Sequence, residues 1–73
     1  MVARNVYCVV AHDQGWLVTS EGRTPIGPFA NRAEAIDSAT RAAEAHLPSQ
    51  VIIYTREGDR ESARTYGRDR FPG

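Results

Sequence analysis

Two apolar segments, residues 6–12 and 51–55, place the strongest constraint on the fold. The first has the sequence Val-Tyr-Cys-Val-Val-Ala-His and the second Val-Ile-Ile-Tyr-Thr, so both alternating sets of side chains are mostly apolar in each. Such segments are typical of strands that are covered on both faces, because a strand with one solvated face alternates apolar with polar residues. Both segments are therefore expected to be central strands of a sheet.

Each central strand is followed by a turn and a more polar segment. Gly15 can adopt the left-handed backbone of a bulged hairpin, and residues 16–21 form the return strand. Gly58 marks a second tight turn, and residues 60–66 form a polar last strand. The two prolines within residues 24–29 limit any extended structure there to a short extra edge strand.

One helix is expected between the two pairs of strands. Asn31 is a favourable N-cap and Glu34 follows three residues later, which makes a capping box in the broad sense. Alanines and one isoleucine recur on one face of residues 32–46, so the helix is thin and can lie close to a sheet. Pro48 ends it.

These segments predict a single α+β domain over residues 1–73, with a β-β-α-β-β core over 5–66 and a docking tail over 67–73. If the helix returns the chain across the first hairpin, the four-stranded sheet is antiparallel throughout, in the order 2-1-3-4. The helix packs on one face only. The other face then needs a cover, and a second copy of the chain is the simplest one.

The size of the chain also favours self-association. A domain of 73 residues has a small core, and such domains commonly depend on disulfides, metals or oligomerisation. One cysteine excludes an internal disulfide, and two histidines with one cysteine cannot complete a four-ligand zinc site. A homodimer is therefore predicted, with no metal and no cofactor. The candidate interface residues are Tyr7, Val9, Trp16, Ile52, Tyr54, Phe71 and Pro72. For Trp16 the main interpretation is packing against the helix or the tail, and an interface anchor is the alternative.

The tail combines aromatic residues, a turn glycine, alternating charge and a closing proline. This composition indicates a segment that docks, either on its own domain or on a second copy. The hypothesis is that Phe71 and Pro72 cover apolar sheet surface that is otherwise exposed.

No catalytic site is expected. A hydrolase needs a nucleophile, a base within hydrogen-bond reach and an orienting acid. The available set is Cys8, His12 and Asp13, but Cys8 and His12 lie about 13 Å apart along one strand at about 3.3 Å per residue. Cys8 is interpreted as a small core residue and His12 as an anchor of the following loop.

Nucleic-acid binding is the alternative function. Nine arginines balance nine acidic residues and lysine is absent, so no net charge attracts the chain to a polyanion. The last third nevertheless places arginine beside tyrosine, as single-stranded nucleic-acid binders do. Interspersed acidic residues make a solvated edge strand an equally good explanation. The candidate contact residues are Arg56, Arg60, Arg64, Tyr66 and Arg68.

No membrane contact is expected, because the start of the chain lacks a secretory signal and no segment is long and apolar enough to span a bilayer. A lone thiol on an apolar strand fits a reducing compartment, so the cytoplasm is the expected location. The expected function is that of a homodimeric interaction or accessory protein, with a further protein partner as an option.

Short motifs along the chain resemble, in their order, those of a bacterial family. Residues 6–12 end in Val-Val-Ala-His and are followed by Gly15-Trp16 and by Glu21-Gly22. This order resembles the opening of the family catalogued as domain of unknown function 2188. Its members have a strand ending in Val-Val-Pro-His, then a Gly-Trp pair and a strand ending in Glu-Gly.

The resemblance continues through the helix start at 33–36 and the turn at Gly58. It ends at residues 66–72, Tyr-Gly-Arg-Asp-Arg-Phe-Pro, where the family has an ending of the type Tyr-Gly-x-Asp-Pro-x-Pro. Nearly the whole chain is covered, and the ordered set is more specific than any one motif.

Three departures stand out. Ala11 replaces the usual proline, Thr19-Ser20 stands where a basic pair is common, and Arg70 replaces the first proline of the tail. Losing the basic pair weakens a nucleic-acid function carried over from relatives. The family supplies no catalytic residues to transfer. Its fold is similar to small bacterial domains that pair through their sheets, which supports a dimer by analogy.

Overall fold

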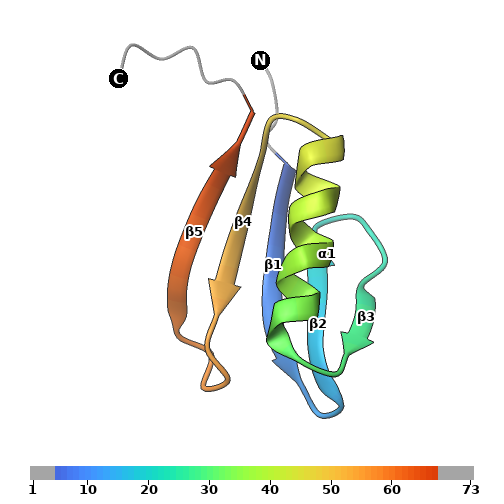
Figure 1. Cartoon of the computed structure of the whole chain (residues 1–73), viewed down its shortest axis with the longest axis vertical. Helices are drawn as coiled ribbons and strands as arrows, with labels where there is room; N and C mark the ends of the chain where they lie inside the picture. Colours follow the sequence, from blue (N-terminus) through green and yellow to red (C-terminus); the bar gives the residue numbers. More distant parts are fainter. Residues whose placement is uncertain (1–4, 68–73) are drawn as a thin grey trace.

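The computed structural model describes residues 5–67, which form a five-stranded sheet and one helix (Figure 1). In chain order the elements are β1 (Asn5–His12), β2 (Gly15–Ser20), β3 (Ile26–Phe29), α1 (Arg32–Ala45), β4 (Ser49–Tyr54) and β5 (Arg60–Tyr66). The strands lie in the order β3-β2-β1-β4-β5. The α+β class and the central positions of the two apolar strands are confirmed, and the extra edge strand is present as β3.

The direction of the second half of the sheet differs from the prediction. β1 and β4 run parallel, with Tyr7 opposite Val51 and Val9 opposite Ile53. The expectation of a four-stranded, fully antiparallel sheet is therefore wrong. β3 pairs antiparallel with β2 and adds one reversal before the helix, so the chain enters β4 in the direction of β1.

The helix begins and ends at hydrogen bonds that its sequence supplies. The Asn31 side chain accepts a hydrogen bond from the Glu34 backbone N–H at 2.9 Å, which confirms the predicted N-cap. At the other end, the buried Ser49 hydroxyl donates to the Ala43 carbonyl at 2.6 Å. This bond satisfies one of the last helical carbonyls and ties α1 to the start of β4.

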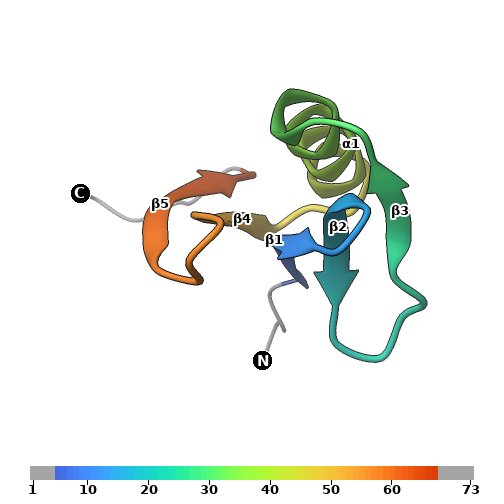
Figure 2. The ribbon, with the colours of Figure 1, turned by 90° about the horizontal axis from the view of Figure 1, so that it is seen from below.

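The core lies between α1 and one face of the sheet (Figure 2). Three alanines on one side of α1 are fully buried, so the helix axis can approach the strands closely. The buried core consists of Tyr7, Val9, Trp16, Val18, Ala35, Ala39, Ala43, Val51 and Ile53.

Gly15 allows β3 to lie beside the first hairpin. Its φ of +135° is in the region that favours glycine, as the bulged hairpin requires. A Cβ at this position would lie 1.9 Å from the Phe29 carbonyl oxygen at the end of β3. The same residue therefore forms the turn and makes room for the third strand.

Candidate interaction surface

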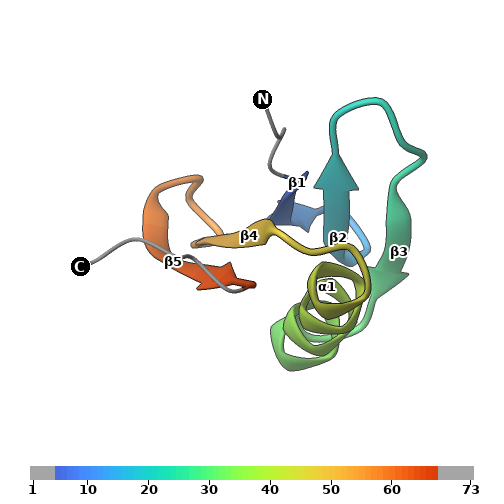
Figure 3. The ribbon, with the colours of Figure 1, turned by 90° about the horizontal axis from the view of Figure 1, so that it is seen from above.

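The face of the sheet opposite α1 is not covered by any other part of residues 5–67 (Figure 3). The strand registers place alternate residues of four strands on this surface. We call it the open face. Its centre consists of Val6, Cys8 and Val10 on β1, Leu17 and Thr19 on β2, Gln50, Ile52 and Tyr54 on β4, and Ala63 and Thr65 on β5. The same registers place His12 and Arg60 at one end of this face.

None of these ten central residues is acidic or basic. The eight on β1, β2 and β4 are half-buried, and the β2–β3 loop flanks three of them, Val6, Cys8 and Thr19. Charged residues lie elsewhere, for example Glu34, Asp37 and Arg41 on the exposed side of α1. The open face therefore has an uncharged, largely apolar centre, with Glu21, Arg23 and Arg60 at its margins.

The open face is hollowed on its β2 side and carries larger side chains on its β4 side. The β2–β3 loop lies on the side of the sheet away from the helix (Figure 2). It forms one wall of a hollow of about 530 Å³. The hollow is lined by Val6, Cys8, Thr19, Ser20, Glu21, Arg23 and Pro25. Ile52 and Tyr54 stand on the other side of β1.

Cys8 lies in the middle of this surface. Burial raises the pKa of its thiol, and a hydrogen bond with Thr19 acts weakly in the opposite direction. The thiol is therefore protonated at neutral pH and is a poor nucleophile. His12 is further along the same strand, where its Nδ1 accepts a hydrogen bond from the Gln14 backbone N–H at 3.1 Å.

The structure revises the predicted interface residues. Tyr7, Val9 and Trp16 face the helix and are only 2%, 0% and 8% exposed, so they are not available to a second chain. Placing Tyr7 and Val9 at an interface was wrong, because both alternating sets of β1 are apolar and the sequence does not say which set meets α1. For Trp16, burial in the core agrees with the other interpretation, packing against the helix. Ile52 and Tyr54 do lie on the open face, and their contact with another chain stays a prediction. Phe71 and Pro72 lie outside the described residues.

Sequence reasoning missed Val6, Val10 and Leu17 as members of the exposed apolar surface. The strand pairing could have found them, since residues opposite each other share a face. Once Tyr7 is assigned to the helix side, its neighbours on β1 must face the other way.

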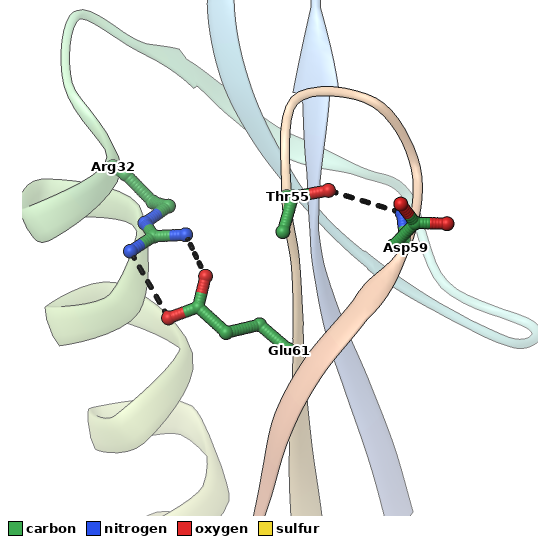
Figure 4. Close-up of polar contacts among 4 residues, drawn as sticks. All are labelled: Arg32, Thr55, Asp59 and Glu61. Carbon is green, nitrogen blue, oxygen red and sulfur yellow. Dashed lines mark hydrogen bonds and ion pairs between the residues drawn. The ribbon is translucent and has the colours of Figure 1, made fainter.

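Trp16 meets two arginines at one end of the helix-covered face. The guanidinium carbons of Arg56 and Arg32 lie 4.9 Å and 5.7 Å from its ring centroid, within the range of cation–π attraction. Arg32 also forms a two-pronged ion pair with Glu61, at 2.6 Å and 3.3 Å (Figure 4). These contacts close the rim of the core, and they give Arg56 a structural partner.

The candidate nucleic-acid residues do not share one face. Ser62 pairs with Ile53 and Arg64 with Val51, so Arg64 is on the helix side of the sheet. A shift of register then places Arg60 opposite Tyr54, on the open side. A regularly alternating strand would place Arg60 and Arg64 on one face, but this irregularity puts them on opposite faces. Arg68 lies outside the described residues.

Within residues 5–67, no group of three or more histidine, cysteine, aspartate or glutamate side chains could hold a metal ion. Over the same range, α1 is too short and too polar to cross a membrane.

The architecture defines a small α+β domain in which one helix covers one face of a mixed five-stranded sheet. The chain belongs to the family described as "Uncharacterized protein conserved in bacteria (DUF2188)", which it matches over residues 7–66. The resemblance inferred from the ordered motifs is thereby confirmed. No curated protein and no solved structure matches the chain.

Proposed function

We propose that this protein is a small, non-enzymatic interaction module that self-associates through its open face. The observation that carries the proposal is the largely apolar centre of the open face, which only the β2–β3 loop flanks among the described segments. Burying such a surface away from water lowers the free energy by about 25 cal/mol per Å² of apolar area.

The absence of charge at the centre of the open face limits the kinds of partner that it can bind. A nucleic acid or a strongly charged peptide would find no counter-charge among the ten central residues of the open face. A second copy presents the same uncharged centre, so contact between the two centres removes no ionised group from water. Contact between identical patches also closes on itself as a dimer and does not propagate into a filament.

The edges of the sheet are poorer candidates than its face. β3 has four residues, and Pro28 lacks a backbone donor for strand pairing. β5 is longer, but it carries Arg60, Glu61 and Arg64 together with an irregular register. Short strands, charged edges and bulges are features that prevent edge-to-edge association. The ten central residues of the open face have none of these features.

The arrangement of Cys8 and His12 supports a non-enzymatic role. The two side chains lie at different levels of β1, burial raises the pKa of the thiol, and Gln14 occupies Nδ1 of the imidazole. Activation of the thiol would require a lowered pKa and a base within reach. The alternative of nucleic-acid binding has less support, because its arginines are distributed over two faces.

Light scattering coupled to size exclusion tests the proposal over a range of concentrations from micromolar to millimolar. We expect the wild-type chain to reach the mass of a dimer and Leu17→Glu, on the open face, to remain monomeric. Ala33→Glu, on the exposed side of α1, is the matched control and should dimerise like the wild type. A wild-type protein that is monomeric at every concentration would refute the proposal.

A further inference from the structure

The open face is asymmetric about β1, with a hollow on the β2 side and larger side chains on the β4 side. We infer that two copies stack about a two-fold axis that runs along β1, so that β4 of each copy lies over β2 of the other. Ile52 of each copy then enters the hollow beside Thr19 of the other. This inference rests on the proposed self-association and specifies how the two copies meet.

The strand register fixes which residues face each other. Thr19 lies opposite Cys8 on one side of β1, and Ile52 lies opposite Cys8 on the other. A two-fold rotation about β1 exchanges the two sides without changing the level along the strands. It therefore places Ile52 over Thr19 twice, and Cys8 over its own copy near the axis.

The other symmetric way to stack the same faces has an axis across the strands. That arrangement places β2 over β2 and β4 over β4, so hollow faces hollow and Ile52 faces Ile52. The hollow of about 530 Å³ would remain unfilled, and the larger side chains would hold the sheets apart. Apolar surfaces pack at the density of a protein interior, so the arrangement that fills both hollows is favoured.

The axis along β1 is also consistent with the positions of small side chains on β5 and of charged residues at the rim of the open face. The wall formed by the β2–β3 loop would lie over β5 of the other copy, where Ala63 and Thr65 leave room for it. At one end of the sheet, Arg60 would approach Asp13 in the exposed β1–β2 turn of the other copy. These charges are opposite in sign, as they should be at the rim of an interface.

The test uses cysteine placement, which the chain permits because Cys8 is its one cysteine. Two variants are made in a Cys8→Ser background, Thr19→Cys and Ile52→Cys, and each is confirmed as a dimer by light scattering. A short bismaleimide suits the spacing of two stacked sheets, which is about 10 Å. We expect a 1:1 mixture of the variants to yield at least fivefold more covalent dimer than either variant alone.

The wild-type protein supplies a second readout. Cys8 should cross-link to its own copy, and its reaction with a thiol reagent should slow as the concentration rises into the dimer range. Efficient cross-linking of Thr19→Cys alone, or of Ile52→Cys alone, would overturn the axis along β1. A dimer whose Cys8 neither cross-links nor becomes protected would overturn the contact at β1. A protein that never dimerises would instead refute the proposed function, and light scattering detects that outcome separately.

Discussion

The two faces of β1 and β4 have the same kind of residues in different surroundings. On the helix-covered face, Val9 and Val51 are fully buried beneath the alanines of α1. On the open face, Val10 and Ile52 stand one residue away in the same strands and remain half-buried. The difference therefore comes from the position of the helix and not from hydrophobicity. In a domain this small, the position of one helix decides which apolar set becomes the core and which stays partly exposed.

The largest expected contrast comes from placing a carboxylate on each face in turn. Val9→Asp buries an unpaired charge beneath α1 and should cost at least about 3 kcal/mol, which is most of the stability of a small domain. Val10→Asp keeps its carboxylate near water and should cost about 1 kcal/mol, while abolishing self-association. Thermal unfolding followed by circular dichroism measures the stability of both variants. Equal destabilisation by the two substitutions would contradict the distinction between the faces.

The next contrast concerns the glycines of the two turns. Gly15→Ala combines a positive φ with a Cβ only 1.9 Å from the Phe29 carbonyl oxygen, so β3 must move. We expect a loss of about 2–4 kcal/mol, since backbone strain costs about 1–3 kcal/mol before any clash is counted. The displaced β3 would also shift the loop that walls the open face.

Gly58→Ala is the matched control for Gly15→Ala. Gly58 has a φ of +96°, but a Cβ there meets nothing within 4 Å. Strain alone should cost about 1 kcal/mol. The free energies of unfolding of both variants in urea separate the cost of backbone strain from the cost of the contact with the Phe29 carbonyl oxygen. A similar loss in both would show that Phe29 does not constrain the first turn.

The sequence predicted much of this fold because its local signals act within a few residues. Asn31 and Glu34 mark the helix start, Gly15 marks the hairpin, and the apolar runs mark the central strands. The strand order 2-1-3-4 was predicted correctly for the four longer strands. The parallel pairing of β1 with β4 was not, because it depends on whether a four-residue edge strand with one internal proline forms a full reversal.

The open face was predicted as a surface but not as a set of residues. The run from Val6 to Val10 is apolar at every position, and only the contact with α1 separates one set from the other. The hollow beside Thr19 had no signal in the sequence, since it depends on the path of the β2–β3 loop. The sequence did indicate that one thin helix would leave one face uncovered.

A smaller contrast between the faces comes from two hydroxyl groups. Ser49 is fully buried and donates to the Ala43 carbonyl at 2.6 Å, whereas Thr19 is half-buried on the open face. Ser49→Ala should cost about 1 kcal/mol, because His46 still donates its backbone N–H to the same carbonyl. Thr19→Val should be close to neutral for monomer stability. Urea unfolding measures the stability of the two variants at a protein concentration too low for dimers to form. A larger loss of stability from Thr19→Val than from Ser49→Ala would contradict the assignment of the faces.

The smallest effect is a pH dependence that arises from Cys8. Burial raises the pKa of its thiol above the ordinary value of 9.0, so the folded chain holds the proton more tightly than the unfolded chain does. Stability from this source is fully present below pH 9.0 and is lost as the pH rises through the folded-state pKa. Wild-type protein should therefore lose more stability than Cys8→Ser between about pH 8 and pH 10, because serine does not titrate there. Parallel urea titrations of the two proteins measure the difference. Identical pH profiles would mean that the thiol is as well solvated in the folded chain as in the unfolded one, and that the open face around Cys8 does not shield it from water.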